Sequence, residues 1–203
     1  MKNILHLASK SPSRKNLLQQ AGIQFTLLEQ EADEHACDWT LPLEQLVESI
    51  ALHKMSSLLK PVHLQDAYAW VLTADTLGSD AQGLIYGKPE DYADGVRQLK
   101  AQRDQWARVA TAFCLERKKI VGDAWETEET VIQTIVSLLY FSIQDNEIDG
   151  YIRESGALNC AGTITIDGVG GQYLKEVQGS YSSIIGLPMH ELRQALKKLD
   201  FFE

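Results

Sequence analysis

A pair of long β-strand segments, following a run of alternating strands and helices, is the feature that most constrains the fold. Residues 107–116 and 127–141 are rich in Val, Ile, Thr and Tyr, which strands favour. A polar turn around Gly122 and Asp123 would join them into a hairpin. Shorter apolar segments upstream alternate with helical patterns, which is typical of parallel strand pairs. Together the two patterns predict an α/β fold with a mixed sheet.

Local start and stop signals place the other elements. Ser11 followed by Pro12 predicts a helix start, because serine caps free backbone N–H groups and proline lacks the donor that would stay unpaired. Gly22 is well placed just after the end of that helix. In residues 42–59, apolar side chains recur at the three- and four-residue steps of an amphipathic helix. We expect helices at 12–21, 42–59, 92–102, 144–153 and 189–199, short strands at 4–8, 25–28, 70–74, 83–86 and 172–177, and loops at 29–38 and 156–171.

Length and cysteine content bound the class of protein. A chain of 203 residues can bury a substantial core, and we expect a single domain over residues 1–203. No segment approaches the roughly 18 to 20 apolar residues of a membrane span, so no membrane partner is expected. The three cysteines are odd in number and widely spaced, which suits a reducing environment. A cytoplasmic location is therefore predicted.

The net charge argues against one class of partner. With 19 Lys and Arg against 28 Asp and Glu, the formal net charge is −9, and the surface as a whole repels long nucleic acids. A small phosphorylated ligand remains compatible with this charge. It would need a local group of cations, helped by a divalent metal ion.

The amino-terminal strand-to-helix connection is a candidate phosphate site. Backbone N–H groups at a helix start attract anions, and Ser9, Ser11, Arg14 and the neighbouring Lys15 add side-chain donors. Such an element could hold a triphosphate. The alternative is a capped surface helix with solvated charges, and the motif by itself does not decide between them.

Three acidic residues could hold a metal ion. Mg²⁺ is commonly bound by one or two carboxylates together with phosphates and waters, which suits Glu34 in a loop and Asp75 at the predicted end of the strand 70–74. Asp75 could instead remove a proton from the attacking water. The alternatives are a solvated acidic loop for Asp33 and Glu34, and an Asx turn for Asp75.

Two lysines would balance these acids. Lys88 lies between Gly87 and Pro89, so its backbone is constrained and its ammonium could neutralise charge on a phosphoryl oxygen. Lys54 lies among mainly apolar residues of the segment 42–59 and could point into the same cleft. Each is compatible with a solvated surface role. Their occurrence together with the serine–arginine segment and the acids favours a phosphate-handling site.

Short motifs spread over nearly the whole chain resemble those of the Maf family. The segment 7–18 resembles the opening of Maf proteins, a strand followed by LAS-x-SP-R-R-x-x-LL. Further resemblances are ADE at 32–34 to their VDE, ALHK at 51–54 to their A-x-x-K, TADT at 73–76 to their GADT, and GKP at 87–89. Near the end, CAG at 160–162, GSY at 179–181 and IGLP at 185–188 resemble their AG, GSY and VGLP.

This resemblance implies an elongated fold similar to inosine triphosphate pyrophosphatases, with a cleft between two lobes. It also implies hydrolysis of a nucleoside triphosphate to its monophosphate and pyrophosphate, dependent on Mg²⁺ or Mn²⁺, and usually a homodimer. The catalytic and phosphate-binding set carried over by position is Ser9, Arg14, Glu34, Lys54, Asp75 and Lys88. Glu34 and Asp75 would be the metal ligands.

Three positions bear on the nucleobase. Ser13 stands where most Maf proteins have a first arginine, Thr76 keeps the pattern of the pyrimidine-selective branch, and Asp167 replaces a glutamine common in that branch. The branch acting on 7-methyl-GTP has a bulky residue, a glutamine and a glutamate at these places. The mixture leaves the base open between UTP or dTTP and 7-methyl-GTP.

A second function class is a nucleotide-binding regulator of septum formation and cell division without significant turnover. The retained acids and lysines favour an enzyme, whereas Ser13 and Asp167 leave room for binding without hydrolysis. A nucleotidyltransferase would need a second substrate site, of which the sequence gives no independent sign.

Overall fold

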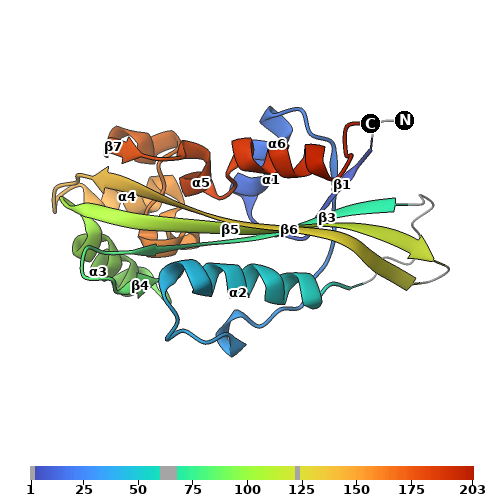
Figure 1. Ribbon diagram of the computed structural model, residues 1–203. Coiled ribbons are helices and arrows are strands. Elements are labelled where there is room, and N and C mark those ends of the chain that lie inside the picture. Colours follow the sequence, from blue (N-terminus) through green and yellow to red (C-terminus); the bar gives the residue numbers. More distant parts are fainter. Residues whose placement is uncertain (1–2, 60–67, 122–123) are drawn as a thin grey trace.

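The computed structural model describes residues 3–59, 68–121 and 124–203 (Figure 1). Seven strands form one sheet in the order β2-β1-β3-β5-β6-β7, with β4 paired to β3. Strands β1, β2 and β3 are mutually parallel, and the other pairs are antiparallel. The predicted mixed α/β sheet is therefore confirmed.

The predicted long hairpin is confirmed and extends beyond its expected bounds. It consists of β5 (Trp106–Val121) and β6 (Ala124–Phe141), which pair antiparallel. The predicted turn at Gly122 and Asp123 lies outside the described residues. The remaining strands are β1 (Leu5–Leu7), β2 (Phe25–Leu27), β3 (Tyr68–Ser79), β4 (Ile85–Tyr86) and β7 (Leu174–Gln178).

Helices cover both faces of the sheet. Figure 1 shows α1 and α6 on one side of the long strands and α2 on the other. The helices α3 and α4 lie toward the left end of the view, away from the N and C labels. The helices are α1 (Pro12–Gln20), α2 (Leu43–Ser56), α3 (Tyr92–Gln102), α4 (Ile148–Ser155), α5 (Tyr181–Ile185) and α6 (Met189–Lys198). Short 3₁₀ helices occupy Glu34–Ala36, Ala157–Asn159, Ala161–Thr163 and Gly168–Gln172.

Local signals account for the ends of α1. The Ser11 hydroxyl accepts from the backbone N–H of Arg14 at 3.4 Å, as expected of a helix cap. Gly22 follows the helix with a φ of 68°, a left-handed conformation that glycine adopts without a steric penalty. This predicted helix start and the glycine after the helix are confirmed.

Several predicted boundaries differ from the observed ones, among them the helix expected at 144–153, which is found at Ile148–Ser155, and tertiary contacts account for two of the differences. The helix expected at 42–59 ends at Ser56, because Leu58 forms an antiparallel bridge with Gln30. The helix α5 was not predicted from the sequence. The strand expected at 70–74 continues to Ser79, because β3 pairs with β5 along its whole length. Asp75 is therefore inside the strand and not at its carboxyl end.

Two hydrophobic clusters divide the molecule into lobes. One contains Leu7, Leu18 and Leu72 and joins α1, β1, β3 and α6. The other contains Leu99, Phe141 and Tyr151 and joins α3, the near ends of β5 and β6, and α4. The long strands connect the lobes, which gives the elongated shape seen in Figure 1.

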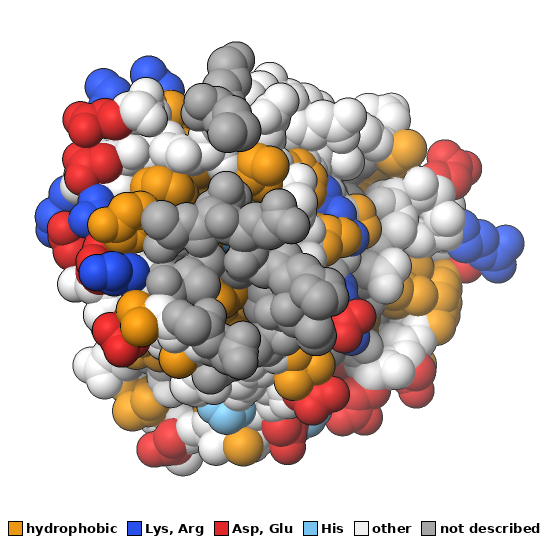
Figure 2. Space-filling view, turned by 90° about the vertical axis from the view of Figure 1, so that its right-hand side faces the viewer, with side chains coloured by type: hydrophobic (Ala, Val, Ile, Leu, Met, Phe, Trp, Pro, Cys, Tyr) orange, Lys and Arg blue, Asp and Glu red, His pale blue; other side chains and the backbone are white. Residues whose placement is uncertain are grey.

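The chain ends meet at the far side of the first lobe. The Asn3 side-chain amide donates to the carbonyl of Phe201 at 2.9 Å. Figure 2 looks onto this end of the molecule and shows acidic and basic side chains interspersed around apolar ones. No helix in the described part of the chain has the length and apolar character needed to cross a membrane.

Candidate active site

The candidate site lies at an opening in the sheet. Strand β1 ends where Leu7 is paired with Leu72, and β4 pairs with β3 only from Gly78 onward. Between these points, no described strand pairs with that edge of β3. Asp75 and Thr76 lie in this interval, and successive strand residues point to opposite faces of a sheet. The strand β3 thus directs one of these side chains to each face of the sheet at the opening.

A lysine joins two carboxylates on the α2 side. Lys54 Nζ lies 2.7 Å from Glu34 Oε1 and 2.7 Å from Asp75 Oδ1. Lys54 is buried because α2 packs its apolar face on β3 and β5 and places this side chain against the strand. The structure therefore brings together three of the predicted site residues, one each from α2, β3 and the 3₁₀ helix Glu34–Ala36.

Asp75 has one oxygen without a partner. Its Oδ2 is buried and makes no hydrogen bond to any described residue. Burial raises the pKa of Asp75 above its ordinary value, against the opposing effect of Lys54 and Arg14. A buried polar atom without a partner is costly unless a ligand, ion or proton satisfies it. This oxygen is the clearest sign of a missing partner in the site.

The pKa of Glu34 is shifted in the opposite direction to that of Asp75. Burial opposes its ionisation, but the ion pair with Lys54 and the charges of Lys88 and Arg14 outweigh burial and lower its pKa. Its side chain is 46% exposed, whereas that of Asp75 is 8% exposed. The site therefore pairs an ionised, accessible carboxylate with a buried one that holds its proton more tightly.

Arg14 projects from α1 into the other face of the opening. Nε donates to the carbonyl of Gly186 at 2.9 Å, Nη1 to Ser9 Oγ at 3.2 Å and Nη2 to Thr76 Oγ1 at 3.1 Å. Burial lowers the pKa of Arg14, and the carboxylates of Asp75 and Glu34 oppose that effect. A guanidinium has five N–H donors and stays protonated in proteins. Three donors are held by protein, which leaves two for a ligand.

The second lobe contributes Lys88 and Asp167. Lys88 is exposed, and its charge lowers the pKa of Glu34, which places it near that carboxylate. Burial raises the pKa of the Cys160 thiol, Asp167 adds to this rise and Lys88 opposes it. Both charges thus lie near Cys160. The Gly87 carbonyl accepts from the N–H of Gly162 at 3.0 Å, which joins the Lys88 turn to this loop.

Other candidates have structural roles or no contact. Asp33 accepts from the N–H of His35 at 3.0 Å and caps the 3₁₀ helix Glu34–Ala36. Ser11 caps α1. The Ser13 side chain makes no hydrogen bond within the described part of the chain. Ser9, by contrast, accepts a hydrogen bond from the Arg14 guanidinium.

Sequence reasoning assigned no role to three contributors. Thr111 and Ser183 connect to Thr76 through hydrogen bonds, and the carbonyl of Gly186 holds Arg14. The only signal for Gly186 was the IGLP segment at 185–188, which the Maf resemblance included without a function, and Ser183 lies between that segment and GSY at 179–181. Their contribution depends on backbone atoms and long-range pairing, which short motifs do not reveal.

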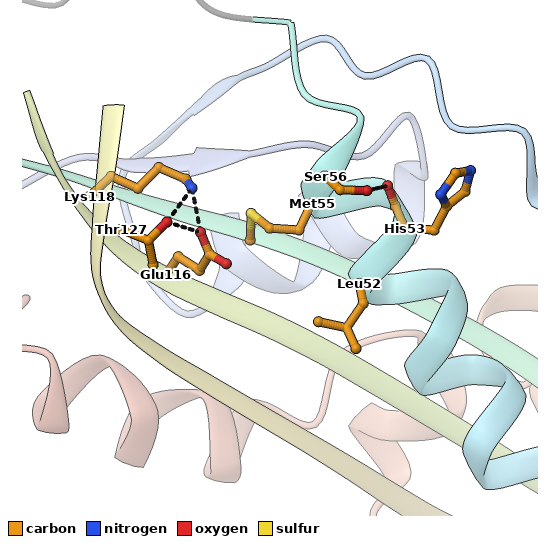
Figure 3. A pocket seen from close by; sticks show the side chains of 7 residues that line it. All are labelled: Leu52, His53, Met55, Ser56, Glu116, Lys118 and Thr127. Carbon is orange, nitrogen blue, oxygen red and sulfur yellow. Dashed lines mark hydrogen bonds and ion pairs between the residues drawn. The ribbon is translucent and has the colours of Figure 1, made fainter. Parts of the chain in front are cut away.

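A hollow elsewhere on the surface is distinct from this site. Figure 3 shows Leu52, His53, Met55 and Ser56 of α2 facing Glu116, Lys118 and Thr127 of the long hairpin. The Lys118 ammonium donates to Glu116 and, at 2.9 Å, to Thr127 Oγ1. Its two charged groups, Lys118 and Glu116, pair with each other.

The donor set fits a divalent ion only if substrate completes the coordination. Within the described residues, no group of three or more His, Cys, Asp or Glu side chains is placed to hold a metal. Glu34 and the unpartnered Asp75 Oδ2 offer carboxylate oxygens. Magnesium is often held by one or two carboxylates with waters and substrate phosphates. The two acids fit that pattern.

Comparison with known proteins supplies the family context. The model of the family described as "Maf-like protein" matches residues 4–199. A nucleoside triphosphate pyrophosphatase of Synechococcus sp. (strain CC9311) is 33% identical over 201 residues, covering 95% of this chain and 98% of the relative. A dTTP/UTP pyrophosphatase of Hydrogenovibrio crunogenus is 32% identical, covering 100% and 99%. A dTTP/UTP pyrophosphatase of Desulfotalea psychrophila is 34% identical, covering 95% and 92%.

Proposed function

The chain belongs to the Maf-like protein family, and we propose that it hydrolyses a nucleoside triphosphate to the monophosphate and pyrophosphate. Relatives that match nearly full length are named nucleoside triphosphate pyrophosphatase and dTTP/UTP pyrophosphatase. The observation that supports the proposal is the joining of Glu34 and Asp75 by Lys54, opposite Arg14, at the opening in the sheet.

The cations would receive the phosphate chain. Arg14 has two N–H donors that no described residue uses, and Lys54 has one ammonium N–H beyond the two directed at Glu34 and Asp75. Lys88 approaches from the second lobe. Charge that develops on the departing pyrophosphate is stabilised most by donors that are already in place. These three residues therefore suit the leaving-group side of the reaction.

The acids would act on the water and the metal. Glu34 and Asp75 would hold Mg²⁺ or Mn²⁺, which supplies charge neutralisation of the phosphates when bound. Either carboxylate could accept the proton of the attacking water, and the bond between the α- and β-phosphates would break. Lys54 holds Asp75 Oδ1, which leaves Oδ2 as the oxygen that would take the metal ion or the proton.

The experiment is turnover of a nucleotide panel by the purified protein with Mg²⁺ or Mn²⁺. UTP, dTTP, 7-methyl-GTP and the common triphosphates are each supplied, and products are separated by anion exchange. We expect equal amounts of monophosphate and pyrophosphate, with no orthophosphate as first product. Release of orthophosphate and a nucleoside diphosphate, or no turnover of any nucleotide, would refute the proposal. The same panel shows which nucleobase the protein prefers.

The regulator hypothesis predicts a different outcome. A binding protein without turnover would hold nucleotide and keep its effect on cells after Asp75→Asn, whereas an effect that needs hydrolysis would vanish. The carboxylates and cations that converge on the opening favour the enzyme. The homodimer and the cytoplasmic location remain predictions from the family resemblance and the cysteine content.

A further inference from the structure

A chain of hydroxyl groups crosses the sheet behind Arg14. Thr76 Oγ1 lies 2.9 Å from Thr111 Oγ1, its cross-strand partner on β5. The Thr111 hydroxyl in turn donates to the carbonyl of Ser183 on α5 at 2.7 Å. Thr111 and Ser183 are fully buried, so neither touches a ligand in the opening. This series of hydroxyl groups links Thr76 in the candidate site to the helix α5.

The two ends of this chain fix the direction of every proton. Arg14 Nη2 can only donate, and the Ser183 carbonyl can only accept. Since Thr111 gives its single proton to Ser183, it must accept the proton of Thr76. Thr76 Oγ1 also accepts from Arg14. One lone pair remains, and Thr76 therefore faces a ligand as an acceptor and not as a donor.

A second path runs from Thr111 to Arg14 through α5. The N–H of Ser180, which precedes α5, donates to Ser137 Oγ on β6 at 3.0 Å. Thr111 holds the same helix by the Ser183 carbonyl. The helix ends at Gly186, whose carbonyl accepts from Arg14 Nε. Two of the three protein contacts of the guanidinium are thus linked to Thr111, Thr76 directly and Gly186 through the last turn of α5.

We propose that Thr111 is a positioning residue for the nucleotide site. It fixes Thr76 as a hydrogen-bond acceptor and holds the Arg14 guanidinium in the orientation that leaves two N–H groups for the ligand. This role rests on the proposed function, because it assumes that Arg14 and Thr76 contact the nucleotide. Without the Thr111 hydroxyl, the Thr76 proton is free to rotate toward the ligand. The Ser183 carbonyl loses its bond across to β5 and keeps the N–H of Gly186 as a donor.

The first test compares Thr111→Val with Thr111→Ser by steady-state kinetics on the preferred nucleotide. Valine has the shape of threonine without the hydroxyl, whereas serine keeps it. We expect Thr111→Val to raise KM about tenfold with kcat changed less than about threefold, as for lost ground-state binding. Thr111→Ser should stay within about twofold of the parent, as a minor change in packing.

A matched control separates positioning from stability. Thr73 is equally buried on β3, and its hydroxyl donates to the carbonyl of Ala51 at 2.8 Å. Thr73→Val removes the same kind of bond without touching Arg14 or Thr76. It should lower thermal stability about as much as Thr111→Val and leave KM unchanged. Equal KM changes in the two variants would overturn the proposal.

A double-mutant cycle asks whether Thr111 acts through Thr76. In a Thr76→Val background, Thr111→Val should raise KM by much less than in the parent, because the hydroxyl it orients is gone. Only the path through α5 would remain. Full additivity of the two changes would show that Thr111 acts independently of Thr76 and would overturn the hydroxyl chain.

A ligand-free measurement separates failure of this proposal from failure of the proposed function. The ¹⁵N-labelled Nε–H resonance of Arg14, assigned by its loss in Arg14→Lys, should shift in Thr111→Val and not in Thr73→Val. If the resonance shifts but no nucleotide is hydrolysed, the proposed function fails and the coupling stands. If nucleotide is hydrolysed but neither the resonance nor KM responds to Thr111→Val, the coupling fails and the function stands.

Discussion

Lys54 holds Asp75 by one carboxylate oxygen and leaves the other bare. Nζ lies 2.7 Å from Oδ1, while the buried Oδ2 has no hydrogen-bond partner among the described residues. The ion pair restrains the carboxylate through Oδ1, so Oδ2 is the oxygen that remains for another partner. The arrangement stabilises the folded chain less than a fully satisfied pair would, and it presents a ready ligand for a cation or proton.

Asp75→Asn should lower kcat by about 10²- to 10⁴-fold, because the amide can neither bind the metal as a carboxylate nor accept a proton. The change conserves shape, so the circular dichroism spectrum should match that of the parent. Asp33→Asn is the matched control, since Asp33 only caps an exposed 3₁₀ helix and asparagine caps equally well. Comparable losses in the two variants would contradict the assignment of Asp75.

Lys54→Met should destabilise the protein by about 3 kcal/mol, because it leaves the buried Asp75 carboxylate without its cation. Chemical denaturation at neutral pH measures the change. Adding Asp75→Asn to this variant should recover part of the loss, since the unpaired charge is then absent. A double variant less stable than Lys54→Met would rule out uncompensated charge as the cause.

The stability of Asp75→Asn relative to the parent should rise with pH in metal-free buffer. The folded-state pKa of Asp75 lies above the ordinary 3.8. The folded chain therefore binds more protons than the unfolded chain, and parent stability falls as pH rises from 3.8 through the folded pKa. The asparagine variant lacks this loss. Denaturation at several pH values measures the difference in free energy of unfolding between the variant and the parent. A difference that stays constant with pH would contradict the prediction.

The stability of Glu34→Gln relative to the parent should change with pH in the opposite direction. The folded-state pKa of Glu34 lies below the ordinary 4.5, so its ionised form adds stability that is present above 4.5 and lost as pH falls through the folded pKa. The glutamine variant should therefore be less stable than the parent above pH 4.5, and the difference should shrink in acid. The same denaturation series measures it, and a difference that grows in acid would contradict the pairing with Lys54.

Gly186→Ala should weaken nucleotide binding as well as the fold. Gly186 has a φ of 138°, and an added Cβ would lie 3.4 Å from Arg14 Cγ. The strain costs about 1–3 kcal/mol and shifts the carbonyl that holds Arg14 Nε. Gly22→Ala is the control, with a φ of 68° and open space around the added atom. Both should lower the melting temperature, whereas only Gly186→Ala should raise KM.

The sequence by itself determined the elements whose signals are local. Ser11, Pro12 and Gly22 set the start and the end of α1 within a few residues, and residue type along 107–116 and 127–141 predicted the long hairpin. The same reasoning identified Glu34, Lys54 and Asp75 as charged candidates. Capping and strand preference act between near neighbours, and they can be recognised without knowing what the segment packs against.

Only the tertiary structure decided where these residues stand. Strand β3 runs past Asp75 because β5 continues to pair with it, so the opening is set by where β1 stops. Arg14 reaches a carbonyl 172 residues away, and Thr76 reaches Thr111 across the sheet. Such contacts depend on strand register and on the packing of distant segments, which local sequence does not encode.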